Sequence, residues 1–277
     1  MTLDELTPGL QQFVHDVIGS QTELASVEVS NGHAGLTFLF DVKQPNAGTE
    51  SYVIKLAPKG VKLSGNTDVY RQAPLLRALK QQNLPVPEVP WAYEDNAWFE
   101  VPFIVMERLP GHTFFVWDPH NDVPRDIDAC KHFWRECVEG LAHMHDFDWR
   151  QQLADWEAPL QLDAEIKRWE RIYQKAPETE WAHAGDAEQR ALLDTLPRDQ
   201  PMGLFHGDYQ PGNCLYQALR LSGIIDWELS GIGPQLVDLG WLCMVADPQV
   251  WSPGWQPLHP PTTRAIAECY RSISNVD

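Results

Sequence analysis

The order of hydrophobic patterns along the chain limits the fold more than any other feature of the sequence. From Ser26 to about Leu56 the residues favour β-structure, with strands expected at 36–42 and 51–56 and a turn at 45–48. After Gly111 helical spacing dominates. The helical patterns cover 4–18, 67–82, 125–146, 163–175, 187–196 and the tail from about 234, with further β-like segments at 89–93, 102–107 and 203–229. A β-rich first third before a helix-rich remainder predicts an α+β protein with two lobes joined near 107–111.

One block of polar residues carries the strongest chemical signal. The stretch His-Gly-Asp-Tyr-Gln-Pro-Gly-Asn places Asp208 and Asn213 five positions apart, and Asp226 follows thirteen positions later, after the apolar run Leu221–Ile225. Phosphoryl transfer needs one carboxylate to orient and deprotonate a hydroxyl, and oxygen ligands that hold Mg²⁺ against the phosphates. Lys55, at the end of a predicted strand, is placed to grip the phosphates. Each residue alone has an ordinary structural explanation, so the joint spacing is what points to phosphoryl transfer.

Composition excludes several other classes of protein. The 277 residues carry 39 acidic and 21 basic side chains, a formal net charge of −18. Nucleic-acid binders and proteins that dock on anionic membranes need clustered Lys and Arg, so neither partner is expected. The sequence contains no Walker-type phosphate loop, no dinucleotide-binding glycine motif, no secretory signal and no apolar run of transmembrane length. With five scattered cysteines as free thiols, we expect a cytoplasmic protein. The oligomeric state is left open.

At these residues the chain resembles the aminoglycoside phosphotransferase/choline kinase-like family, which shares the protein-kinase fold. GLFHGDYQPGNCLY and LSGIIDWELSGIGPQLVDLGW resemble its catalytic signature, PFIVMERLPG resembles its hinge, and residues from about 29 to 245 follow its order. The resemblance implies a bilobal protein-kinase-like fold. Its nucleotide-binding lobe would span 1–107, and its catalytic and acceptor-binding lobe 108–277.

The resemblance also implies roles for individual residues. Asp208 would be the catalytic base, Asn213 and Asp226 the Mg²⁺ ligands, and Lys55 the phosphate clamp. Backbone groups near Glu107 and Leu109 would bind adenine. The implied reaction moves the γ-phosphoryl group of ATP or GTP to a hydroxyl of a small molecule. The sequence does not identify this acceptor, which in the family is an aminoglycoside, a macrolide, a hydroxyacyl-CoA or another metabolite.

Three features depart from the family pattern. Gln72 stands where the family often has a glutamate that pairs with the strand lysine; Gln can hydrogen-bond Lys55 but supplies no charge. The phosphate-covering loop, 30–35, keeps only two glycines, of which Gly32 is the expected nucleotide contact. Relatives usually continue with more helix beyond Asp277, so the resemblance implies an incomplete C-terminus.

Two alternative functions stay open. A catalytically weak or inactive nucleotide-binding protein of the same fold, acting as scaffold or regulator, is favoured by Gln72 and disfavoured by the retained Lys55, Asp208, Asn213 and Asp226. A protein kinase is disfavoured because the block reads His-Gly-Asp instead of His-Arg-Asp, and no Ala-Pro-Glu motif follows within reach of Asp226.

Several other residues invite a functional interpretation beside a structural one. We expect His206 and Asp238 to order the catalytic segment, whereas Glu228 can equally support the metal through water. Trp149, Trp156, Trp169 and Trp181 lie where the family builds its acceptor pocket. Ordinary burial is the expected explanation for them, and an aromatic wall for an acceptor is the functional one.

Overall fold

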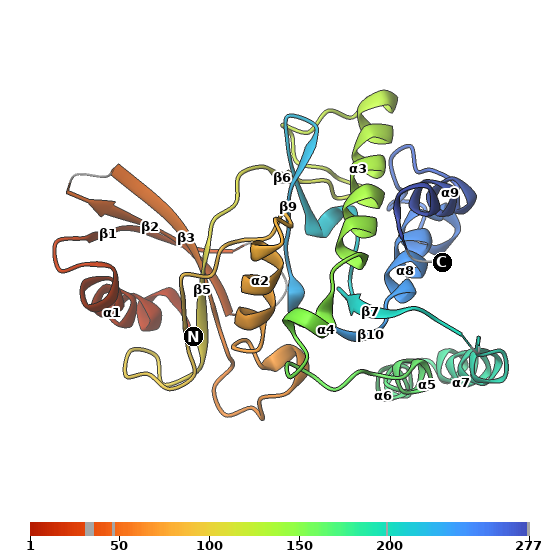
Figure 1. Cartoon of the computed structure of the whole chain (residues 1–277), viewed down its shortest axis with the longest axis horizontal. Coiled ribbons are helices and arrows are strands. Elements are labelled where there is room, and N and C mark those ends of the chain that lie inside the picture. Colours follow the sequence, from red (N-terminus) through yellow and green to blue (C-terminus); the bar gives the residue numbers. More distant parts are fainter. Residues whose placement is uncertain (31–35, 46–47, 198, 276–277) are drawn as a thin grey trace. The chain divides into compact units, whose positions relative to one another are not determined.

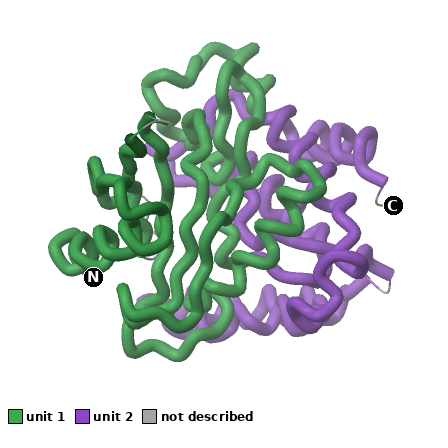
Figure 2. The backbone as a smooth tube through the Cα atoms, turned by 60° about the vertical axis from the view of Figure 1, so that its left-hand side comes forward, with its two compact units in different colours: residues 1–133, 211–229 green, residues 134–210, 230–277 purple. Residues whose placement is uncertain are grey.

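A computed structural model describes residues 1–30, 36–45, 48–197 and 199–275. The chain divides into two compact units, one of residues 1–133 and 211–229 and the other of residues 134–210 and 230–277 (Figure 2). The lobe boundaries predicted above, 1–107 and 108–277, stay a prediction. The phosphate-covering loop with Gly32, part of the expected 45–48 turn and Asp277 lie outside the described residues.

The first unit is built on an antiparallel sheet with the strand order β1-β2-β3-β5-β4 (Figure 1). Its strands are β1 (Glu23–Val29), β2 (Leu36–Gln44), β3 (Gly48–Leu56), β4 (Trp91–Tyr93) and β5 (Phe103–Glu107). These bounds confirm the predicted strands: β2 and β3 are longer than predicted, whereas β4 and β5 are shorter than the predicted segments 89–93 and 102–107. In the register, Lys55 of β3 stands between Thr37 of β2 and Ile104 of β5, so the lysine occupies an interior strand of the sheet.

An N-terminal helix packs on this sheet through aromatic side chains. Helix α1 (Leu3–Phe13), followed by one π-helical segment (Val14–Ile18), begins at a capping box between Thr2 and Glu5. Phe13, fully buried, makes edge-to-face contacts with Trp91, Trp98 and Phe103, at centroid distances of 5.8, 5.4 and 5.5 Å. This aromatic cluster packs the N-terminal helix against β4 and β5.

Helix α2 (Gln72–Gln81) begins five residues later than the expected 67–82 segment. The physical reason is Pro74, which lacks a backbone N–H and is tolerated only in the first turn of a helix. A 3₁₀ turn (Gly65–Thr67) lies in the preceding segment. Leu75, Leu76 and Leu79 are buried, as their helical spacing predicted.

A second, three-stranded sheet completes the first unit. It contains β6 (His112–Thr113), β8 (Cys214–Gln217) and β9 (Arg220–Ile224) in the order β6-β8-β9, with short 3₁₀ turns at Pro211–Asn213 and Trp227–Leu229. Gly111 precedes β6 with φ +114°, and a Cβ there would lie 2.7 Å from the Tyr216 carbonyl oxygen. Glycine is therefore required where the chain enters this sheet.

The second unit is mainly helical. Its elements are α3 (Ile127–His145, beginning in the first unit), α4 (Trp149–Gln152), α5 (Leu162–Lys167), α6 (Glu170–Tyr173), α7 (Thr179–Asp194), β7 (Met202–Phe205), β10 (Gly231–Pro234), α8 (Leu236–Ala246), a 3₁₀ turn (Pro248–Val250) and α9 (Thr263–Ile273). Strands β7 and β10 pair antiparallel and carry the chain into and out of the first unit's 211–229 segment. The observed mixture of sheets and helices confirms the α+β class.

Two helical predictions need correction in detail. The expected helix 163–175 is two short helices, α5 and α6, although Arg168 and Trp169 between them keep right-handed helical backbone angles. Helix α7 begins at Thr179 instead of 187 and buries no residue among those described. Its first turns carry no apolar stripe, so hydrophobic periodicity gave no sign of them.

The five cysteines are free thiols, as expected. Among the described residues, no helix is both long and apolar enough to cross a membrane.

Candidate phosphotransferase site

Within the first unit, tertiary folding brings the predicted strand lysine to a predicted metal ligand. The Nζ atom of Lys55 lies 2.8 Å from Oδ1 of Asp226 and 3.7 Å from Oε2 of Glu228. Lys55 is 8% exposed, so its ammonium depends on these carboxylates for the interactions that water would otherwise supply. Lys55 and Asp226 are separated by 171 positions in the chain.

Asp226 lies directly beyond β9 in an unusual backbone conformation. Its φ is +67°, a left-handed angle that Asp tolerates better than most residues. The N–H of Ile225 donates to the Asn213 carbonyl oxygen at 2.9 Å, which holds the two predicted metal ligands on neighbouring segments of one unit. A carboxylate and an amide oxygen are hard donors of the kind that Mg²⁺ prefers. The donor set of this segment therefore fits the cation that the resemblance implies.

Asp208 lies in the second unit, beyond β7, and its carboxylate is fixed from two sides. Its Oδ1 atom accepts hydrogen bonds from Nε1 of Trp241 and Nε2 of Gln210, both at 2.9 Å. The backbone N–H of Asp208 donates to Nδ1 of His206 at 3.3 Å. These contacts set the position of the carboxylate that we predicted as the base.

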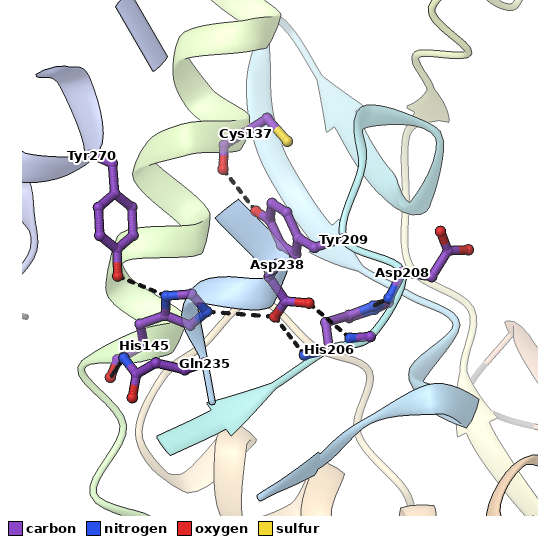
Figure 3. A network of polar contacts seen from close by, with 9 residues as sticks. Cys137, His145, His206, Asp208, Tyr209, Gln235, Asp238 and Tyr270 are labelled. Atoms are coloured by element: carbon purple, nitrogen blue, oxygen red, sulfur yellow. Dashed lines mark hydrogen bonds and ion pairs between the residues drawn. The ribbon is translucent and has the colours of Figure 1, made fainter. Parts of the chain in front are cut away.

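A buried network holds the backbone just before Asp208 (Figure 3). Asp238 of α8, 1% exposed, accepts the N–H of His206 at 2.6 Å on Oδ2 and the N–H of Gly207 at 2.8 Å on Oδ1. Oδ2 is also 3.4 Å from Nε2 of His145, whose Nδ1 lies 2.7 Å from the Tyr270 hydroxyl. Since an ionised carboxylate only accepts, Nε2 of His145 donates to Asp238.

This network explains two residues singled out in the sequence. His206 is fully buried and Asp238 anchors the loop that carries Asp208, so both have the ordering positions expected of them. Gly207, between His206 and Asp208, has φ +87°, a backbone conformation that favours glycine. His145, near the end of α3, belongs to the same network.

The other predicted nucleotide contacts are placed as follows. Gln72 is 2% exposed at the start of α2, yet among the described residues no hydrogen bond joins it to Lys55. The N–H groups of Glu107 and Arg108 are used internally, donating to the carbonyl oxygens of Glu88 and Ser51. The N–H of Leu109 makes no backbone hydrogen bond within the described part of the chain, unlike the other two amides.

The second unit also contains a cavity of about 330 Å³ next to the Asp208 loop. Gly207, Asp238 and Trp241 form part of its wall, and the rest comes from helices α5, α6 and α7 and from Val237. Most of the wall is apolar, and its further lining residues are Leu162, Glu165, Ile166, Trp169, Tyr173, Gly185, Glu188, Gln189 and Leu192. A small, mostly apolar cavity with a few polar groups is typical of ligand sites.

Glu165 is the most unusual polar group in this wall. It is 6% exposed, and its Oε1 accepts from Nε of Arg168 at 2.9 Å and Nε1 of Trp169 at 3.3 Å. Burial raises the pKa of Glu165, and the Arg168 charge opposes that shift. Its Oε2 atom is buried without a hydrogen-bond partner among the described residues, as is Nε2 of Gln189.

The sequence analysis missed several residues of this arrangement. Glu165 belongs to a group of acidic residues that the sequence assigns either to a cationic acceptor or, preferably, to a solvated helix face, and the second expectation is wrong for Glu165 because it is buried. Gln189 gave no signal, because it lies in a helix that looks like an ordinary polar one. Trp241 could have been found, since it follows Asp238 by three positions on a helix and so lies on the same face. Of the four tryptophans named as wall candidates, Trp169 lines the cavity, whereas Trp181 is 60% exposed. Glu228, considered as a support of the metal through water, has its Oε2 atom 3.7 Å from Nζ of Lys55, and its role toward a metal stays a prediction.

Solved structures with similar folds are phosphotransferases. A candidate aminoglycoside phosphotransferase from Ralstonia eutropha superposes with a TM-score of 0.72 at 21% identity, over 98% of this chain and 80% of that one. The GDP and kanamycin complex of APH(2″)-IIIa gives 0.65 at 16% identity, over 98% and 83%. Macrolide 2′-phosphotransferase type I gives 0.62 at 19% identity, over 100% and 85%. These likenesses confirm the kinase-like fold.

Curated relatives include much longer proteins. "Probable acyl-CoA dehydrogenase IBR3" of Arabidopsis thaliana is 29% identical over 245 residues, which cover 83% of this chain and 29% of that protein. Acyl-CoA dehydrogenase family member 11 of Gallus gallus is 26% identical over 218 residues, 77% of this chain and 27% of that protein. The chain thus spans less than a third of the length of these relatives. Viomycin phosphotransferase of Streptomyces vinaceus is 27% identical over 147 residues, about half of each chain.

A family model matches most of the sequence. The profile of the phosphotransferase enzyme family, APH, covers residues 27–258, which include Lys55, Asp208, Asn213 and Asp226. With this match and the shared kinase-like fold, the chain belongs to the phosphotransferase enzyme family.

Proposed function

We propose that this protein transfers the γ-phosphoryl group of ATP or GTP to a hydroxyl of a small molecule. The observation that carries the proposal is the ion pair between Lys55 and Asp226, 2.8 Å apart, in which the lysine is buried and the aspartate partly exposed. The pair brings together a strand lysine and a strand-end aspartate from distant parts of the chain. A lysine that binds the phosphates and an aspartate that binds the metal must lie this close together, because both act on the same nucleotide. Family membership supports the same reaction class.

In the proposed reaction, Asp208 accepts the proton of the acceptor hydroxyl while the hydroxyl oxygen bonds to the γ-phosphorus. The bond between that phosphorus and the bridging β–γ oxygen breaks, and the nucleoside diphosphate leaves with its electron pair. Trp241 and Gln210 hold Oδ1 of Asp208 in place. Because positioning supplies most of the rate in phosphoryl transfer, these two contacts matter as much as the basicity of the carboxylate.

The remaining groups would act on the nucleotide. Lys55 would exchange its contact with Asp226 for the α- and β-phosphates, and the Leu109 amide would face the adenine or guanine base. Asn213 and Asp226 would hold Mg²⁺, which neutralises charge on the phosphates when bound. The acceptor would enter the cavity beside Gly207, and an aminoglycoside, a macrolide and a hydroxyacyl-CoA are the candidates that the family and the relatives suggest.

Asp208→Asn tests the proposed base. General-base assistance contributes about 10²–10⁴-fold to rate, and the carboxamide is nearly isosteric with the carboxylate. Transfer should fall by that factor, measured as release of nucleoside diphosphate across an acceptor panel. Nucleotide affinity, measured by calorimetry in Mg²⁺, should stay near that of the wild type. Full turnover in Asp208→Asn would exclude Asp208 as the base.

A second candidate function is a nucleotide-binding protein without transfer activity. It is favoured by Gln72, which is uncharged and forms no hydrogen bond to Lys55 within the described residues. The same calorimetry separates the two candidates. A wild-type protein that binds Mg-nucleotide but phosphorylates neither water nor any acceptor in the panel would favour the scaffold.

A further inference from the structure

Two histidines and an aspartate meet on the surface of the first unit, away from the residues assigned to phosphoryl transfer. His112 begins β6, and His120 and Asp122 lie in the segment between β6 and α3. One ligand atom from each of the three side chains lies within 4.8 Å of the other two. Oδ2 of Asp122 is 3.5 Å from Nε2 of His112 and 3.6 Å from Nδ1 of His120. Two imidazoles therefore face the same carboxylate oxygen.

These separations are close to those that a metal ion imposes. A tetrahedral ion with bonds of about 2.0–2.2 Å places its ligand atoms about 3.3–3.5 Å apart, and both distances from the Asp122 oxygen are near this range. The two imidazole rings stack in parallel, with 4.0 Å between centroids and 5° between planes, so they must turn to point at one ion. The histidine side chains are 45% and 49% exposed, so the rings can turn without disturbing the core.

The backbone that carries the three side chains is held in place. His112 is paired with Tyr216 of β8 in the second sheet. The N–H of Val123 donates to the carbonyl oxygen of His120 at 2.9 Å, which closes a turn around Asp122, and the Val123 side chain is 5% exposed. An ion that binds here therefore has to order side chains but not backbone, and this lowers the entropic cost of binding.

The donor set selects the kind of cation. Imidazole nitrogen suits Zn²⁺, Cu²⁺ and Ni²⁺, whereas Mg²⁺ and Ca²⁺ prefer oxygen ligands. A ligating imidazole must offer an unprotonated nitrogen. Nδ1 of His120 already does so, because it accepts the N–H of Asp122 at 3.2 Å. This hydrogen bond is exposed, so water can take over the N–H when a metal ion takes the nitrogen.

We propose that His112, His120 and Asp122 form a site for Zn²⁺ or a chemically similar divalent transition-metal ion, with its remaining coordination position open to water. The site is separate from the Mg²⁺ site proposed at Asn213 and Asp226, and it does not rest on the proposed function. Because the ion bridges β6 and the segment that follows it, and the unfolded chain lacks this arrangement, binding stabilises the folded protein.

Calorimetric titration with ZnCl₂ tests the inference on the full chain without a polyhistidine tag. The buffer contains no chelator, is at about pH 7.5, where imidazoles are mostly neutral, and holds millimolar Mg²⁺ to fill the oxygen-donor site. The wild-type protein should bind Zn²⁺ with a Kd of about 1–10 µM, weaker than closed sites with four protein ligands. No saturable binding up to about 200 µM Zn²⁺ would overturn the inference.

Variants assign the binding to the three side chains. His112→Gln and His120→Gln should each weaken Zn²⁺ binding by about 100-fold or more, since loss of a residue that only supports a metal ligand already costs about 10–100-fold. Asp122→Asn removes the charge but keeps an oxygen donor, so it should weaken binding by about tenfold. All three side chains are exposed, so the variants should fold, which circular dichroism checks. Wild-type affinity in either histidine variant would overturn the inference.

Two matched controls separate this site from Zn²⁺ binding elsewhere on the surface. His183→Gln removes an exposed histidine of α7 in the second unit, and Asp118→Asn removes a carboxylate of the same segment that pairs with Arg125 at 3.4 Å. Both should keep the wild-type Kd. Zn²⁺ should also raise the Tm of the wild type and of both controls, but not that of His120→Gln. Equal loss of affinity in a control, or an equal rise in Tm in His120→Gln, would contradict the inference.

Discussion

Replacing Asp238 by Asn should destabilise the protein and displace the loop that carries Asp208. Asp238 receives two backbone N–H groups, one on each carboxylate oxygen. Asn has a single acceptor oxygen, which can keep the His206 N–H and the His145 contact at the Oδ2 position. Its amide nitrogen must then face the Gly207 N–H, so an attractive contact becomes a donor against a donor.

The magnitude follows from these contacts. Losing one hydrogen bond to a charged acceptor costs about 1.5–3 kcal/mol, and the His206 bond weakens to neutral strength, a further cost of about 1 kcal/mol. The free energy of unfolding should therefore fall by about 2–4 kcal/mol, which lowers Tm by about 5–15 °C. Urea denaturation followed by tryptophan fluorescence and circular dichroism measures it.

Asp163→Asn is the matched control for this prediction. Asp163 has the same side chain and accepts from Lys167 at 2.8 Å, but its pair is exposed and four residues apart on one helix. Exposed pairs of this kind contribute little, so its urea midpoint should stay close to that of the wild type. If Asp238→Asn and Asp163→Asn have the same midpoint, the buried network does not hold the loop and the reasoning fails.

Three further predictions concern other parts of the molecule. Trp241→Phe removes the donor to Asp208, so kcat should fall about 3–30-fold with nucleotide affinity unchanged; an equal rise in KM with kcat unchanged would argue against a positioning role. Lys55→Met should weaken Mg-nucleotide binding in calorimetry, and wild-type affinity would show that Lys55 does not hold the phosphates. The Ser51 hydroxyl, and with it that of Ser26, lowers the pKa of Asp41 below its ordinary 3.8. The stability from this carboxylate is present above pH 3.8 and is lost as the pH falls from there through the lowered pKa. Asp41→Asn should therefore make the urea midpoint less dependent on pH in that acid window, and an unchanged acid dependence would contradict this assignment.

The sequence by itself determined the elements and the reaction class. Runs of apolar and β-favouring residues predicted β2, β3 and β5, and the leucine spacing of α2 predicted its buried face, because both patterns follow from local geometry. The spacing of Asp208, Asn213 and Asp226 pointed to phosphoryl transfer, since it lies within one short stretch of chain. Local rules also have limits: the β8–β9 turn is formed by Ala218 and Leu219 with φ of +49° and +66°, residues that give no turn signal.

Only the tertiary structure decided which partners these residues have. The sequence predicted Gln72 as the partner of Lys55. In the structure the lysine ammonium pairs with Asp226 and Glu228, because β9 ends beside β3 within the first unit. Asp238 was expected to have an ordering role, but its hydrogen bonds to the His206–Gly207 backbone depend on the packing of α8 against β7. The unmatched atoms of Glu165 and Gln189 are likewise invisible in the sequence, since burial and the absence of a partner are properties of packed helices and not of residue order.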